Sequence, residues 1–520
     1  MNMGFFQFMQ RISRLFTDHK TIIYIPCLVF LMILIPGCIS PVEFTEDAFV
    51  TSRSSSETSD RFPDYEYNPE TLRYASGPRA AVKEDGYYLE INSALYFYDI
   101  QTEMLFPLCT KASCLHKDET CPAFIFNAGW RSDDEERVKI WTDTAYGHRI
   151  WYYQEHLYMI AQDPDKGMVL FRYGPDYTGQ EEIAWLTDYE KEPRTMFTGR
   201  MLFHHGYIYY MTHLFDDQAV WYADEYETVY TVWRVKPEKK AKPEELFSFD
   251  CHYRGSQIFR IGAVQNKIYV MIEYETFSII PENERKEGEN PLNVNAGFGR
   301  VYQYDEDRNQ AELIWSYSGE QMVSLFEAEG AMPRNTHSDD YLVNAEGDYV
   351  YLSGMPEHYE DGLMPTGIAS VNLITGEGKV LYKTPYKKIE QLRSDGRHYY
   401  FLEIGAGGTY LTAIDQEGNL LRRYEMPYDE AYIRMMEEKS KLPREEWAND
   451  RLRLLVTDGR YIVLGDDGAR IYKNLSSKLN YDGRKYSHVD NGVGLIDAED
   501  FLSGKDVEIR QIYERMDPFD

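Results

Sequence analysis

The sequence predicts an all-β fold, a β-propeller of seven blades with loop and short helical insertions. The first observation behind this is a unit that recurs seven times, a turn dipeptide followed by a short aromatic strand, at spacings of about 50 to 80 residues. The second is the presence of 44 tyrosines among 520 residues, because tyrosine suits pleated, half-buried surfaces. The third is that no linker divides the repeats, so one closed fold accounts for all of them.

The seven copies share a tight turn before a strand rich in Tyr, Val and Ile. They begin at Asp85, Glu155, His205, Asn266, Gly347, Asp395 and Asp458. Asp-Gly and Gly-X dipeptides supply the positive φ that tight hairpins require. A second strand, a polar turn and usually a third apolar strand follow each copy, as at 410–415 and 420–424. Stacking such four-stranded units around an axis buries their faces, whereas two stacked β-sandwiches are the alternative fold.

Several segments between the repeats carry predictions of their own. We expect a loop over 280–299, a short helix over 431–441 and a strand of the last blade over 469–472. A strand over 507–513 is expected to close the ring against the start of the propeller. The glycine-rich run 405–408 lies between two strands, so it predicts a hairpin turn and not a phosphate loop.

The N-terminus predicts export and attachment to a membrane. A basic start precedes an apolar run over 21–35, which is too short for an ordinary spanning helix and typical of a signal peptide. The following Ile35-Pro36-Gly37-Cys38 resembles the lipobox of bacterial lipoproteins, in which the cysteine carries the lipid. We therefore expect a lipoprotein signal peptide over 1–37, a lipidated Cys38 with a flexible tether over 38–74, and the propeller over 75–520. An uncleaved apolar anchor is the alternative.

The net charge of −31, from 55 basic and 86 acidic residues, argues against two classes of partner. Such a surface repels nucleic acid and anionic lipid, so neither is expected to bind the body of the protein. The acidic residues are expected to keep an exported protein soluble.

A cluster of cysteine and histidine follows the first repeat. Cys109, Cys114, His116 and Cys121 lie within thirteen residues and offer the ligands of a four-coordinate structural zinc site. A catalytic zinc is disfavoured because the protein would supply all four ligands. Disulfides among Cys109, Cys114, Cys121 and Cys251 are the main alternative in an exported chain, and free thiols are the third.

The same residues carry a resemblance to a known family. Pro107-Leu108-Cys109, Cys114-Leu115-His116 and Cys121-Pro122, together with the lipobox, resemble uncharacterised surface lipoproteins of anaerobic Gram-positive bacteria. Those proteins have a WD40-like or TolB-like β-propeller with a Cys/His loop after an early blade. The resemblance covers the lipobox and residues 84–124, implies a propeller on an extracellular lipoprotein, and brings no established activity. Reducing, oxygen-free surroundings would favour the metal over the disulfide.

Established catalytic motifs are missing from the sequence. It holds no G-x-S-x-G, H-E-x-x-H, phosphate-binding loop between strand and helix, or EF-hand spacing. His204 and His205 could form a ligand pair but precede a turn, so exposed loop positions are expected.

These observations favour a non-catalytic binding module over an enzyme. The module would lie on the extracytoplasmic face of a bacterial membrane, held by its lipid, and bind a glycan, peptide or protein. Two alternatives stay open: a surface hydrolase or lyase that uses carboxylates at the propeller channel on carbohydrate, and a structural partner of a membrane complex.

Overall fold

A computed structural model describes the repeat region and little of the sequence before it. The described residues are 51–52, 80–91, 94–109, 111, 113–114, 121, 123, 150–163, 166–192, 194–215, 227–252, 257–279, 292–318, 341–343, 347–353, 366–386, 388–405, 408–426, 452–467 and 490–514. The chain divides into two units, Met1–Ala48 and Phe49–Asp520, and every described residue belongs to the second. The expected signal peptide over 1–37 and Cys38 lie outside the described residues. In the described part of the chain, no helix has the length and apolar character needed to cross a membrane.

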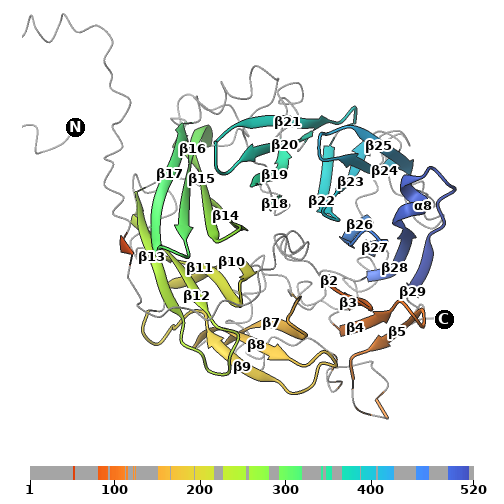
Figure 1. Cartoon of the computed structure of the whole chain (residues 1–520), viewed down its shortest axis with the longest axis horizontal. Coiled ribbons are helices and arrows are strands. Elements are labelled where there is room, and N and C mark those ends of the chain that lie inside the picture. The colour runs from red at the N-terminus through yellow and green to blue at the C-terminus, as the bar shows by residue number, and fades with distance from the viewer. Residues whose placement is uncertain are drawn as a thin grey trace, which may run out of the picture. The chain divides into compact units, whose positions relative to one another are not determined.

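Seven antiparallel sheets form a ring, which makes the second unit a seven-bladed β-propeller (Figure 1). Blades one and two contain β2 (Ala80–Lys83), β3 (Gly86–Ile91), β4 (Ala94–Asp99), β5 (Met104–Pro107), β6 (Ile150–Tyr153), β7 (His156–Asp163), β8 (Gly167–Tyr173) and β9 (Glu181–Trp185). Blades three and four contain β10 (Thr195–His204), β11 (Tyr207–Phe215), β12 (Glu227–Val235), β13 (Glu244–His252), β14 (Gln257–Val264), β15 (Lys267–Ile279), β16 (Leu292–Asp305) and β17 (Gln310–Ser318). Blades five and six contain β18 (Tyr341–Val343), β19 (Asp348–Ser353), β20 (Gly367–Asn372), β21 (Gly378–Lys383), β22 (Lys388–Ser394), β23 (His398–Gly405), β24 (Gly408–Asp415) and β25 (Leu420–Glu425). Blade seven contains β26 (Leu452–Thr457), β27 (Tyr461–Asp467), β28 (Asp490–Asp497) and β29 (Arg510–Glu514), with the short helix α8 (Ala498–Leu502) between the last two.

Within each blade the four strands follow one another in chain order, and the first strand lies nearest the centre of the ring (Figure 1). These inner strands contact their counterparts in neighbouring blades, as β14 does with β10 and β18. The third blade gains one more strand, because β1 (Thr51–Ser52) pairs with β13. The fold predicted from the repeats is confirmed, and separate β-sandwiches are excluded by the seven-sheet topology.

All seven predicted turns join the first and second strands of a blade. Two of them place positive φ at both central residues: Gln154 and Glu155 have φ of 47° and 61°, and His205 and Gly206 have 47° and 75°. This is the signature of a type I′ turn, whose twist matches that of the flanking strands. The Asp-Gly-Arg turns use Gly396 at φ 89° and Gly459 at φ 84°.

The hydrophobic core is divided into clusters that lie between neighbouring blades, and tyrosine fills much of it. Tyr209, Tyr230 and Tyr302 are each 0% exposed in the cluster between blades three and four. In the same cluster Phe249 stacks on Tyr302, with ring centroids 4.4 Å apart. The tyrosine content is thus explained by packing between blades, where aromatic rings bury large areas.

Closure of the ring differs from the prediction. The C-terminal strand was expected to close the ring against the start, but β29 pairs with β28 inside the seventh blade. Blades seven and one are joined by packing side chains, and the Tyr87 hydroxyl donates to the Asp458 carboxylate at 2.8 Å. Beside this contact Tyr513 of β29 approaches Tyr96 of β4, with ring centroids 6.0 Å apart. Among the described residues, the seam is therefore held by side chains and not by a shared sheet.

Three other local predictions have different outcomes. The hairpin turn over 405–408 is confirmed, since Gly405 of β23 pairs with Gly408 of β24. The loop predicted over 280–299 is wrong for 292–299, which belong to β16 and pair with β15 out to Leu292 opposite Ile279. Pairing with β15 overrides a composition that is poor in strand-forming residues. The predicted strand over 469–472 and helix over 431–441 lie outside the described residues.

Candidate metal centre after the first blade

The three clustered cysteines lie in the link that leaves the first blade. Cys109 lies two positions after Pro107, the last residue of β5, and the two sides of the link are tied to Leu95 of β4. The Leu108 amide donates to the Leu95 carbonyl at 2.9 Å, and the Leu95 amide donates to the Ala123 carbonyl at 2.7 Å. These bonds bring Cys121 back beside the point where the link begins. The first blade therefore holds Leu108 and Ala123, which lie close to Cys109 and Cys121 in the chain, at one residue of β4.

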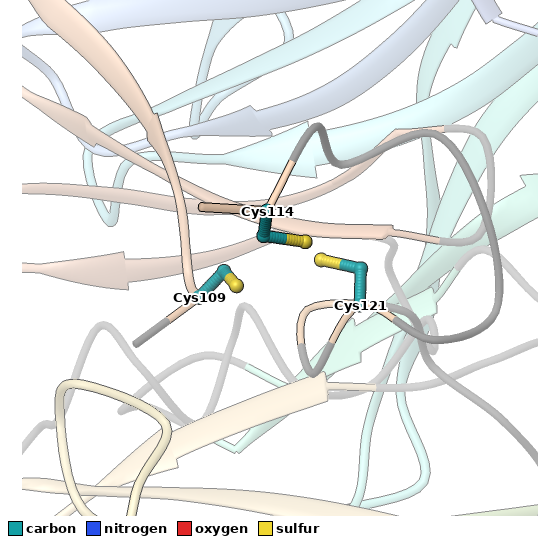
Figure 2. Close-up of side chains that lie close together, drawn as sticks. All are labelled: Cys109, Cys114 and Cys121. Atoms are coloured by element: carbon teal, nitrogen blue, oxygen red, sulfur yellow. The ribbon is translucent and has the colours of Figure 1, made fainter. Parts of the chain in front are cut away.

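The thiols of Cys109, Cys114 and Cys121 converge. Their sulfur atoms all lie within 4.8 Å of one another. Figure 2 shows the three side chains pointing toward a common centre from different parts of the link. Cys121 is 3% exposed, and the other two are partly buried. Of the three thiols, Cys121 is thus the most enclosed.

The protonation of the cluster indicates what it can bind. The pKa of the Cys121 thiol is raised to about 11, mainly by burial, which the Ala123 backbone opposes and hydrogen bonds with Cys114 and Cys109 reinforce. Without a cation the sulfur atom of Cys121 therefore stays protonated near neutral pH. A bound divalent ion supplies the positive charge that makes thiolates stable, so metal binding would release protons.

The distances suit a zinc ion after small adjustments. Tetrahedral zinc with Zn–S bonds of about 2.3 Å places its sulfur ligands about 3.8 Å apart. The observed separations of up to 4.8 Å exceed this by about an ångström at most. Three thiols at this spacing could hold a zinc ion or a similar soft metal, and two of them could instead be oxidised to a disulfide.

The structure brings together three of the four predicted zinc ligands. His116 lies outside the described residues, as does the lipidation candidate Cys38. Cys251, the remaining partner in the disulfide alternative, lies in β13 of the third blade opposite Thr228 of β12. The three-cysteine set is therefore confined to the link after the first blade.

The structure corrects the expectation for the histidine pair and adds a residue that sequence reasoning missed. His204 is 7% exposed, and His205 is also largely buried, so these are not exposed loop residues. His205 contacts the carboxylate of Glu306, which lies 101 residues further along the chain. No local spacing could have indicated Glu306, because the contact depends on the packing of blade four against blade three.

The carboxyl groups of the described residues show one consistent trend. Each carboxyl pKa that departs from its ordinary value is lowered; these groups belong to Asp176, Glu181, Asp188, Glu192, Glu306, Asp395 and Asp415. Hydrogen bonds to the ionised form oppose the effect of burial in the two most buried cases, Glu306 and Asp395. A general acid in glycoside hydrolysis needs a raised pKa, which is the opposite direction.

Similarity to known proteins is confined to the fold. No protein-family profile matches the chain, and no curated protein matches it. The propeller domain of the trilobed protease from Pyrococcus furiosus is 10% identical, with a TM-score of 0.39 over 84% of this chain and 98% of that chain. Acylaminoacyl peptidase from Pyrococcus horikoshii is 9% identical, with a TM-score of 0.41 over 84% of this chain and 52% of that chain, so the match spans about half of the peptidase. A TolB-like protein from Agrobacterium tumefaciens is 7% identical, with a TM-score of 0.26 over 52% of this chain and 76% of that chain. The chain shares a β-propeller with peptidase propeller domains and TolB-like proteins.

Proposed function

We propose that the protein is a lipoprotein on the extracytoplasmic face of a bacterial membrane, whose propeller is a non-catalytic binding module. In this proposal Cys38 carries the lipid and 39–74 form the tether. Cys109, Cys114, Cys121 and His116 hold a structural zinc ion that shapes one loop of the binding face. The charge of −31 favours a neutral or basic ligand, of glycan, peptide or protein nature.

The observation that carries the binding role is the length of one hairpin. Strands β15 and β16 have 13 and 14 residues, whereas the second and third strands of the other blades have six to nine within the described ranges. They remain paired out to Ile279 and Leu292, so among the described strands the fourth blade has the longest second-to-third hairpin, which we call the arm. Long loops on a rigid scaffold are common sites of recognition.

The arm and the cysteine loop project from the same face of the propeller. Strands alternate in direction, so the connection between a blade's second and third strands lies at the same end as the exit from its fourth strand. The arm ends at the second-to-third connection of blade four, and the cysteine loop follows the fourth strand of blade one. The arm and the cysteine loop would therefore both face the same ligand.

Shortening the arm tests the binding role. Ile272 and Arg300 are cross-strand partners, so a two-residue Asn-Gly turn can replace 273–299. The full-length chain in detergent micelles is then screened on glycan and peptide arrays beside this variant. We expect the shortened arm to lose the array signals of the unmodified protein while its melting temperature changes little.

A matched control shortens the equivalent connection of blade seven. Asp467 and Asp490 are cross-strand partners there, so the same Asn-Gly turn can replace 468–489. This control should retain binding. Equal binding by all three proteins, or no array signal from the unmodified protein, contradicts a glycan- or peptide-binding role for the arm.

The anchor and the zinc are tested separately. We expect Cys38→Ser to abolish incorporation of radiolabelled palmitate and release the protein from membranes, and retention of both would contradict lipidation. We expect the Cys114→Ser variant to hold one equivalent of zinc fewer than the unmodified full-length chain, as counted by mass spectrometry. An equal zinc count in the two proteins would refute the structural zinc at the cysteines, and thiol labelling would then distinguish free cysteines, which react, from a disulfide, which is protected.

A further inference from the structure

We propose that His204, His205 and Glu306 form a second metal site, which binds a divalent transition metal at the seam between blades three and four. The site contains two imidazoles and one carboxylate and no sulfur. The site lies at two turns. The turn after β10 connects the first and second strands of blade three, and the turn after β16 connects the third and fourth strands of blade four. These turns lie on the face of the propeller opposite the cysteine loop, so the two sites are independent.

Backbone contacts fix all three side chains. His204 is the last residue of β10, and His205 occupies the type I′ turn with φ of 47°. Glu306 opens the turn after β16, where its amide donates to the Asn266 carbonyl at 2.9 Å. That bond joins the two turns of blade four to each other. The ligands therefore come from short, hydrogen-bonded turns and not from long loops.

The separations between ligand atoms match those of a metal site. His205 Nδ1 lies 2.6 Å from Glu306 Oε2, and His204 Nε2 lies 3.8 Å from the same oxygen. Ligands at about 2.0–2.1 Å from a zinc ion are about 3.3 Å apart in tetrahedral geometry, and the observed values bracket this distance. The two imidazole rings are stacked with centroids 3.7 Å apart, which brings both nitrogen atoms toward one carboxylate oxygen.

The surroundings of Glu306 prepare it as a ligand. The Tyr209 hydroxyl donates to Oε1, which leaves Oε2 facing the histidines. Contacts with His205 and Tyr209 therefore hold both oxygens of the carboxylate in place. An outer hydrogen bond that orients a ligating carboxylate is typical of metal sites.

Metal binding would replace hydrogen bonds of the present arrangement. His204 Nε2 lies 2.6 Å from the Gln265 carbonyl, and His205 Nδ1 lies 2.6 Å from Glu306. Each neutral imidazole can move its proton to the other ring nitrogen, so the ligating nitrogens become available without net loss of a proton. Two imidazoles and one carboxylate suit Zn²⁺, Co²⁺, Ni²⁺ or Fe²⁺, and three protein ligands leave a position for water or an external ligand.

The test distinguishes a metal site from a hydrogen-bonded contact that only joins blades three and four. The double variant His204→Gln and His205→Asn keeps amide donors near the positions of Nε2 and Nδ1 but removes both imidazoles. Full-length protein stripped with EDTA is titrated with Co²⁺, and bound metal is counted by mass spectrometry after gel filtration. We expect the variant to bind one equivalent fewer than the unmodified protein, with at least about 100-fold weaker affinity at this site. Its melting temperature in EDTA should stay close to that of the unmodified protein.

Spectroscopy and a control distinguish this site from the cysteine loop. The Co²⁺ ion that the unmodified protein binds and the double variant does not should add d–d absorption bands. It should add no sulfur-to-cobalt charge-transfer band, whichever metal the cysteines hold. His398→Asn is the matched control, because His398 Nδ1 also lies beside a carboxylate oxygen, 3.0 Å from Asp395 Oδ2, and it should leave the metal count unchanged. Equal Co²⁺ binding by the double variant overturns the proposal. Should the double variant fail to fold, Glu306→Gln replaces it, and an unchanged count in that variant is equally decisive.

Discussion

A buried histidine in the third blade predicts how the stability of the propeller depends on pH. His213 of β11 is 9% exposed and lies edge-on to Tyr230, its cross-strand partner in β12. Burial penalises the charged imidazolium and lowers the pKa of His213 from 6.5 to about 4. In the unfolded chain the group recovers its ordinary pKa of about 6.5.

The sign and size of the effect follow from these two pKa values. Above the unfolded pKa both states hold a neutral imidazole, and the stability of the folded state is complete. As the pH falls through 6.5 toward 4, the unfolded chain takes up a proton that the folded chain excludes, so stability is lost progressively. Between about pH 7.5 and about pH 5 the loss is about 2 kcal/mol, because each pKa unit corresponds to about 1.4 kcal/mol.

The assay compares the unmodified protein with His213→Gln by urea unfolding at several pH values in the presence of EDTA. Other titrating groups affect both proteins, so the difference between their free energies of unfolding isolates His213. We expect that difference to shift by about 2 kcal/mol in favour of the variant on going from about pH 7.5 to about pH 5. His213→Phe provides a second comparison if the glutamine variant is too unstable. A difference that stays within about 0.5 kcal/mol over this range would refute the reasoning.

Two further predictions concern packing and a buried carboxylate. Phe249→Ala removes a ring stacked on Tyr302 and should lower the free energy of unfolding by about 3–5 kcal/mol, whereas Leu421→Ala, at a side chain 42% exposed, should change it by less than about 0.5 kcal/mol in the same urea titration. Glu403 is 0% exposed and accepts hydrogen bonds from three hydroxyl groups and a guanidinium, so Glu403→Ala should cost about 3–5 kcal/mol by leaving these donors without their acceptor. Glu425→Ala at an exposed position is its control, and equal thermal shifts in the two glutamate variants would contradict the assigned role.

Much of the fold was predictable because its signals are local. A turn that needs positive φ, such as Asp458-Gly459, carries that requirement in two adjacent residues, and an apolar strand that begins at Tyr461 follows at once. The innermost strands of the blades were not identified, because the repeat seen in the sequence begins at the turn that follows them. Strand β26, for example, precedes the Asp458 turn and is recognised as a strand only through its pairing with β27.

The ends of elements were less predictable for a related reason. Residues 292–299 have a loop-like composition, yet they form part of β16 because β15 supplies hydrogen-bonding partners. The C-terminal strand was predicted as a strand, but its place in the seventh sheet depends on β28. Local composition indicates whether a segment tends to form a strand or a loop, whereas the available partner strand decides whether and where it pairs.

The two candidate metal sites also differ in whether their residues could be identified from the sequence alone. The sequence alone determined the cysteine set, because Cys109, Cys114 and Cys121 are separated by a few residues and a short link can bring them together in many folds. Only the tertiary structure joined Glu306 to His205 across 101 residues, since that contact requires blade four to pack against blade three and its turns to meet. Contacts within a short segment are limited by chain length and can be inferred from spacing. Contacts between blades depend on the summed burial of many side chains, which no spacing in the sequence records.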